Sequence, residues 1–235
     1  MDEFSPNRRV VNDINGLNRF LTRMYGLMTL AVLVSALTAW LVMGVFAKQF
    51  TSFMINNRWG IWLIILLPIF LTFGISFNAT RSPGLGLVLL IITSIVYGIT
   101  FAFIAGAYTG TDIATAFVSS AGIFLTMALI GTCSHRDFAR AGSFASAALI
   151  GLIIAMVVNF FLQNPAIDYI LSVIAVIIFT ILTAWDAQRM KNIYLEYGEG
   201  ASTTGLAILG ALQLYLDFIN LFINFLDIFG SSDER

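Results

Sequence analysis

The chain has 235 residues, of which 59% are hydrophobic and only 11% are charged, and its net charge is −1. A soluble domain carries about 25% charged residues, and a domain of this size cannot bury so much apolar surface. These values predict an integral membrane protein and exclude a basic surface for nucleic acid. The single cysteine, Cys133, excludes an internal disulfide, and neither it nor His135 has a second ligand at metal-binding spacing. No cofactor is therefore expected.

Apolar stretches long enough to span a bilayer follow one another along the chain. There are seven of them, at residues 25–47, 61–79, 84–106, 113–133, 143–162, 167–186 and 204–229. They are separated by turn signals at Ser82-Pro83-Gly84, Thr109-Gly110-Thr111-Asp112, Asn164-Pro165 and Gly198-Glu199-Gly200. We expect one all-α transmembrane domain at residues 25–230, a polar N-terminal segment at 1–24 and a short polar tail at 231–235. The N-terminal segment lacks an apolar core with a cleavage site, so the first span is expected to stay uncleaved.

The positive charges divide unevenly between the two sides that seven spans would create. One side would receive Arg8, Arg9, Arg19, Arg23, Arg81, Arg136, Arg140, Arg189 and Lys191, and the other Lys48, Arg58 and Arg235. Cytoplasmic segments of membrane proteins carry the excess of Lys and Arg. The split predicts a cytoplasmic N-terminus and an external C-terminus.

Polar residues interrupt the last apolar stretch at a helical period. They are Gln213, Asp217, Asn220, Asn224 and Asp227, at steps of four, three, four and three. At 100° per residue they fall within roughly an 80° stripe on one helical face. An ionisable group that faces lipid costs from about 2.5 to well over 10 kcal/mol. The stripe is therefore expected to face a polar interior, with Asp227, near the outer end, solvated.

A second carboxylate, Asp186, lies at the inner end of the sixth stretch, and Arg81, at the inner end of the second, is the nearest candidate counter-charge. Two carboxylates brought together in low dielectric cannot both ionise cheaply, so such a pair responds to pH. Asp217 lies about thirteen residues, or roughly 20 Å, into its helix. It would meet Asp186 only if the last helix began near Leu209 or water entered from the inner side. Otherwise Asp186 simply marks a helix end.

Two segments carry a resemblance to a known family. Leu214-Tyr215-Leu216-Asp217-Phe218-Ile219-Asn220-Leu221-Phe222, followed by an apolar run to Gly230, resembles the C-terminal signature of the Bax inhibitor-1 family. Trp185-Asp186-Ala187-Gln188-Arg189-Met190-Lys191 is similar to its penultimate-helix motif, an aromatic residue, Asp, any residue and Gln, followed by basic residues. The chain looks most like the bacterial inner-membrane members.

This resemblance implies six helices wrapped around a central seventh, and a pH-sensitive calcium leak rather than an enzyme. By position in the motifs, the gating aspartate dyad would be Asp186 and Asp217, and the gating arginine would be Arg81. The dyad would bind permeant calcium transiently, and Gln213, Asn220 and Asn224 would line its path. Calcium takes six to eight oxygen ligands, so this incomplete set suits passage rather than storage.

Three other functions are compatible with parts of the pattern. Some bacterial relatives are linked to restraining a membrane protease, which makes partner binding the main alternative, although a partner surface needs no buried acid pair. An intramembrane aspartyl protease would need Gly-x-Gly-Asp and Pro-Ala-Leu segments, which the chain lacks. A retinal protein would need a lysine in the last span, and none is present there.

Overall fold

The computed structural model describes residues 14–79, 81–197 and 203–233, and in these residues every regular element is a helix. The helices are α1 (Ile14–Gly44), α2 (Ala47–Asn56), α3 (Arg58–Asn78), α4 (Pro83–Ala105), α5 (Gly110–Cys133), α6 (Ala139–Leu162), α7 (Pro165–Tyr197) and α8 (Thr203–Asp233). The all-α prediction is confirmed. The polar segment at 1–13, the turn signal at 198–200 and the last two residues lie outside the described part.

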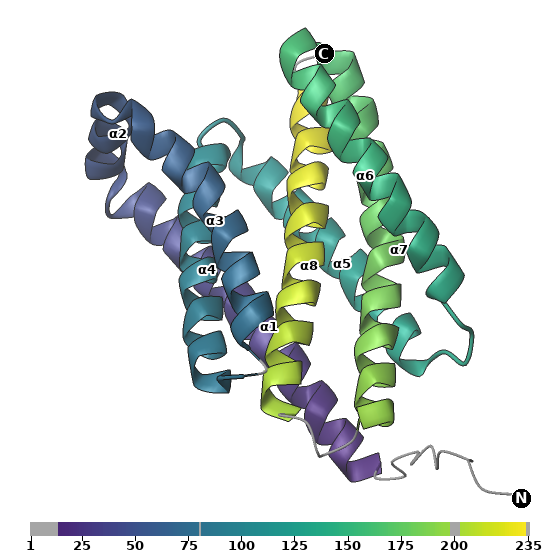
Figure 1. Ribbon diagram of the computed structural model, residues 1–235. Helices are drawn as coiled ribbons and strands as arrows, with labels where there is room; N and C mark the ends of the chain where they lie inside the picture. Colours follow the sequence, from purple (N-terminus) through teal and green to yellow (C-terminus); the bar gives the residue numbers. More distant parts are fainter. Residues whose placement is uncertain (1–13, 80, 198–202, 234–235) are drawn as a thin grey trace, which may run out of the picture.

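Six of these helices are long and apolar enough to cross a membrane: α1, α4, α5, α6, α7 and α8. α3 is 21 residues long and apolar along most of its sequence, and within its described residues the apolar segment is Leu66–Ser76. The protein is thus a helical membrane protein with six candidate spans in its described part. α3 runs antiparallel beside α4 (Figure 1) and packs against it, and it is the segment on which a seventh crossing depends.

Several helices begin at turn residues that were predicted from the sequence, and local interactions explain these starts. Pro83 stands in the first turn of α4, where its missing N–H is not needed. Thr109 and Asp112 form a capping box at the start of α5: the Thr109 hydroxyl accepts from the Asp112 amide at 3.2 Å, and Asp112 Oδ2 accepts from the Thr109 amide at 2.9 Å. Asn164 Oδ1 accepts from the amide of Ala166 at 3.0 Å where α7 starts.

Two boundaries and one additional helix differ from the sequence expectations. α1 begins at Ile14 rather than at 25, because the face that carries Phe20 and Met24 is buried and continues the helix into the segment expected to be a polar extension. α8 likewise continues to Asp233, into the expected tail. The short α2 follows the first span, and the hydropathy pattern did not reveal it.

The largest difference is at α7, which runs about eleven residues past Asp186 to Tyr197 instead of ending there. One polar side chain of this extension, Gln188, is buried and bonded to backbone groups outside α7. Gln188 Oε1 accepts from the Phe138 amide at 2.8 Å, and its Nε2 donates to the Arg136 carbonyl at 2.7 Å. Gln188 therefore holds the connection between α5 and α6 against α7.

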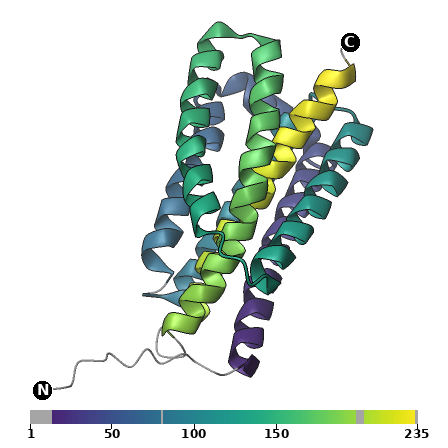
Figure 2. The same ribbon diagram turned by 90° about the vertical axis from the view of Figure 1, so that its right-hand side faces the viewer.

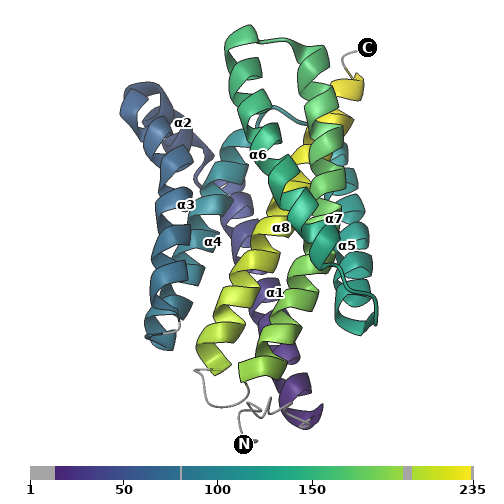
Figure 3. The ribbon, with the colours of Figure 1, turned by 45° about the vertical axis from the view of Figure 1, so that its right-hand side comes forward.

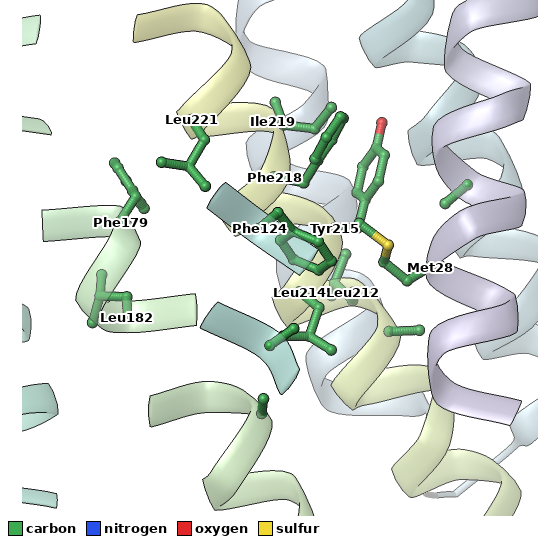
Figure 4. Packing of buried hydrophobic residues seen from close by; sticks show 14 of the residues in the cluster. Met28, Phe124, Phe179, Leu182, Leu212, Leu214, Tyr215, Phe218, Ile219 and Leu221 are labelled. Atoms are coloured by element: carbon green, nitrogen blue, oxygen red, sulfur yellow. The ribbon is translucent and has the colours of Figure 1, made fainter. Parts of the chain in front are cut away.

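The apolar side of α8 packs against α1 and α5. Phe218 meets Phe124 of α5 edge to face, with ring centroids 5.8 Å apart (Figure 4). The Tyr215 hydroxyl lies 2.6 Å from Ser35 Oγ of α1. Within the described residues, α8 packs against α1, α3, α4, α5 and α7. Its polar stripe is thereby directed away from α1 and α5.

The ends of the helices define the two ends of the bundle. α1 and α8 begin at the same end, and α8 finishes at the other, as two views at right angles agree (Figures 1 and 2). The turns between α4 and α5 and between α6 and α7 lie at the end where α8 finishes, which we call the far end. An odd number of crossings by the chain fits this arrangement.

Candidate functional site

The structure brings Asp186 of α7 and Asp217 of α8 together. Their side chains are 1% and 4% exposed, and the two carboxyl groups are close enough for a direct hydrogen bond. α7 and α8 pack along each other (Figure 3), which places one aspartate on each side of their contact. The pair thus lies inside the bundle, out of reach of lipid.

The two residues meet because of the length of α7, and not for the reason expected from the sequence. α8 starts at Thr203 and not near Leu209, so Asp217 lies roughly 21 Å from the start of its helix. α7 continues beyond Asp186 for a comparable distance, roughly 17 Å. The two helices are antiparallel neighbours, so these lengths put both carboxyl groups at similar depth. The interpretation of Asp186 as a residue at a helix end was wrong.

Hydrogen bonding around the pair leaves one oxygen of each carboxyl group without a donor. Asp186 Oδ2 accepts from Gln213 Nε2 at 3.2 Å. Asp186 Oδ1 and Asp217 Oδ2 are buried, and no described residue donates to them. Two ionised carboxylates offer only acceptors, so a direct hydrogen bond between them requires a proton on one. A single proton shared by the pair would halve its buried charge.

A cavity of about 360 Å³ adjoins the pair between α6, α7 and α8. Its polar lining comes from Ser146, Asp186, Gln213, Asp217, Asn220 and Asn224, so four of the five residues of the predicted stripe share one space. Asn220 Nδ2 donates to the Leu216 carbonyl at 2.8 Å, and Asn224 Nδ2 donates to the Asn220 carbonyl at 2.7 Å. These bonds use the amide nitrogens, and the amide oxygens remain as acceptors for an occupant of the cavity. Gln213 is exposed, which places one edge of the lining at the protein surface.

The structure does not bring Arg81 to the dyad. Arg81 is exposed in the turn between α3 and α4, and it forms no ion pair with any residue in the described ranges. The cation that acts on Asp186 is instead Arg189, whose guanidinium lies 5.2 Å from the centre of the Trp185 ring. Arg189 follows Asp186 by three positions, the spacing at which helical side chains are neighbours. That spacing was the signal that could have identified Arg189 from the sequence.

One further expectation changes in the described structure. Asp227 was expected to be solvated, but it is partly buried, and its Oδ1 accepts from the Tyr108 hydroxyl at 2.6 Å. Tyr194 of α7 is buried and stacks on Phe20. Within the described ranges, no three His, Cys, Asp or Glu side chains are placed to hold a metal ion together. A cation in the cavity would therefore rely on two carboxylates and on amide oxygens.

These features define the class of protein as a polytopic helical membrane protein with an ionisable interior site. The bundle has six candidate spans, a buried carboxyl pair on adjacent helices and a polar cavity beside that pair. Comparison with known proteins identifies the family. Residues 17–234 match the family model described as "Inhibitor of apoptosis-promoting Bax1". The chain therefore belongs to the Bax inhibitor-1 family, and the resemblance seen in its last two helices is confirmed.

Bacterial relatives match the chain over nearly its whole length. Inner membrane protein YbhL of Escherichia coli strain K12 is 35% identical over 234 residues, which cover 98% of this chain and 99% of YbhL. An uncharacterized membrane protein of Streptococcus pyogenes serotype M1 is 36% identical over 218 residues, 93% of this chain and 95% of that protein. The uncharacterized protein YrjE of Lactococcus lactis is 33% identical over 216 residues, 92% of each chain.

Proposed function

We propose that the protein is a pH-sensitive leak pathway for calcium, gated by the pair Asp186–Asp217. The observation that carries this proposal is the buried carboxyl pair, with its two donor-free oxygens, on the wall of a cavity lined by amide groups. Intramembrane ionisable residues usually mark ion or proton pathways. The hydrogen bond between the two carboxyl groups requires a shared proton. Conduction through the pathway would therefore depend on pH.

Protons and calcium would compete for the same oxygen atoms. With the shared proton in place, the two carboxyl groups hold α7 and α8 together. Without it, two charges face each other, and a divalent cation is the natural partner for them. Calcium takes six to eight oxygens, and the dyad supplies at most four. Asn220, Asn224 and water would complete the shell, which makes the site weak enough for an ion to leave.

The family's gating arginine maps onto Arg81, and we retain this role as part of the proposal. In the present conformation Arg81 is exposed and unpaired within the described residues. A gating role would therefore require the turn between α3 and α4 to move toward the dyad. Arg189 already acts on Asp186, so Arg81 would add to an existing charge interaction.

We also propose a topology of seven crossings, with α3 as the second and α8 at the centre, in the bacterial inner membrane. The five helices that α8 contacts and the inner-membrane name of YbhL support this arrangement. The N-terminus would be cytoplasmic and the C-terminus external. Reporter fusions at the two ends should give opposite signals in intact cells. A cytoplasmic signal from both ends would reduce the crossings to six and remove α3 as a span.

The function is tested by calcium flux into liposomes that contain only the purified protein. We expect uptake above protein-free vesicles at the same pH, with a clear difference between pH 6 and pH 8. The control is protein reconstituted after heat inactivation. Absence of flux at every pH would contradict the leak pathway. That result would favour the alternative, a regulatory protein that binds a membrane protease, because such a role needs no permeation.

A further inference from the structure

At the far end of the bundle, a second polar contact ties three elements together. Asp227 of α8 accepts from the Tyr108 hydroxyl at 2.6 Å and from Ser172 Oγ of α7 at 3.4 Å. Tyr108 belongs to the turn between α4 and α5, next to the capping box at Thr109. The contact therefore joins this turn to the last two helices.

A glycine in α8, Gly230, leaves room for the Tyr108 ring beside the helix backbone. A Cβ atom added to Gly230 would collide with the ring carbons of Tyr108. Gly230 lies three positions after Asp227, on the neighbouring part of the same helical face. The glycine thus lets one edge of the ring lie close against α8, where the hydroxyl reaches the carboxylate.

This contact stands at the end of the polar stripe. The cavity beside the dyad extends along α8 as far as Asn224, and Asp227 is the next member of the stripe, three positions further. An ion that followed the stripe from Asp217 toward the far end would reach Asp227 next. There it would meet the Tyr108 side chain, which occupies one carboxylate oxygen.

The charged groups that act on Tyr108 are all carboxylates: Asp227, Asp168 of α7 and Asp112 of α5. Burial, together with the hydrogen bond that the hydroxyl donates to Asp227 and the nearby negative charges, raises the pKa of Tyr108, so the hydroxyl stays protonated and remains the donor. A negative region of this kind attracts cations. A cation that reached Asp227 would compete with the hydroxyl for the same oxygen.

We propose that Tyr108 and Asp227 form a second gate at the far end of the pathway, closed in this structure and opened when a cation displaces the tyrosine hydroxyl from the carboxylate. The proposal rests on the leak function and deepens it. It puts two barriers in series, the dyad near mid-membrane and the tyrosine contact at the far end. Asp227 then serves as the binding group for the ion between bulk solution and the dyad.

Two substitutions open this gate by different routes. Tyr108→Phe removes only the hydroxyl, and Gly230→Ala pushes the ring away while keeping both polar groups. Each should raise calcium flux in protein-only liposomes about three- to tenfold, since a hydrogen bond to a charged group holds the closed state. Asp227→Asn keeps an acceptor for the hydroxyl and should hold the gate partly closed, whereas Asp227→Ala should not.

The matched controls make the same chemical changes elsewhere. Tyr97→Phe removes a tyrosine hydroxyl from α4, where the ring packs on Tyr215 outside the cavity lining. Gly151→Ala adds a methyl group to α6 at a position with no atom within 4 Å. Both should keep the parent's flux. If Tyr108→Phe and Gly230→Ala behave like these controls while the parent conducts, the gate is wrong and the leak function stands.

A second measurement does not depend on flux. In a Cys133→Ser background, Ser172→Cys places a thiol within the contact, beside Asp227, at a position 2% exposed. Adding Gly230→Ala should increase its rate of reaction with a charged, membrane-impermeant thiol reagent at least fivefold, whereas adding Gly151→Ala should not. An unchanged rate would overturn the gate even if the parent carried no calcium at all.

Discussion

Replacing Asp217 by Asn is expected to flatten the pH dependence of calcium flux. The amide keeps the shape of the carboxyl group and can donate a hydrogen bond to Asp186 without any shared proton. One of the two titrating groups is then gone, and the other no longer titrates as a pair. A hydrogen bond to a charged group is worth about 1.5–3 kcal/mol, so the balance between closed and open states should shift by about tenfold or more. Flux into protein-only liposomes between pH 5.5 and 8 measures the change.

The same experiment on three other variants defines the dyad. Asp186→Asn should flatten the profile in a similar way, because either substitution removes the shared proton. The double variant should add little, since the two residues act as one unit. Asp137→Asn, an exposed aspartate in the connection between α5 and α6, is the charge-matched control and should keep the parent's profile. A parent-like profile in Asp217→Asn would remove this residue from the gate.

Gly131→Ala is expected to destabilise the protein despite the higher helix propensity of alanine. Gly131 of α5 packs directly on the α7 backbone, and an added Cβ atom would collide with the carbonyl group of Ala184. A backbone group cannot swing aside, so α5 and α7 must separate. Overpacking of this kind costs about 1–3 kcal/mol. The midpoint of heat inactivation, measured by the fraction that stays monodisperse in detergent, should fall by several degrees. Ala184 precedes Asp186 by two positions, so the variant should also disturb the dyad.

Gly151→Ala is the control that separates the effect of overpacking on stability from the effect of helix propensity. Both glycines lie inside helices, and replacing either by alanine should gain up to about 1 kcal/mol from propensity alone. Gly151 has open space around it, so only this gain should appear, as an equal or higher midpoint. If both variants shifted the midpoint in the same direction, the close approach of α5 to α7 would not be limiting stability.

Much of the fold and part of the site follow from local sequence. The composition requires a membrane, and the turn residues at Pro83 and at Thr109–Asp112 begin helices where expected. The period of the polar residues in α8 shows which face avoids lipid, and the structure places four of these five residues on one cavity. These features depend on a residue and its near neighbours along one helix, and a helical period expresses them directly.

Which groups meet across helices was decided by the tertiary structure. Asp186 reaches the depth of Asp217 because α7 continues past it, and α7 can continue because Gln188 finds backbone partners in a distant connection. Arg81 stays exposed, and Asp227 is bound by a tyrosine 119 residues away in the chain. A sequence period tells which side of a helix is polar. The partner and depth of each polar group depend on where helices end and how closely they pack, and those distances arise only when the chain has folded.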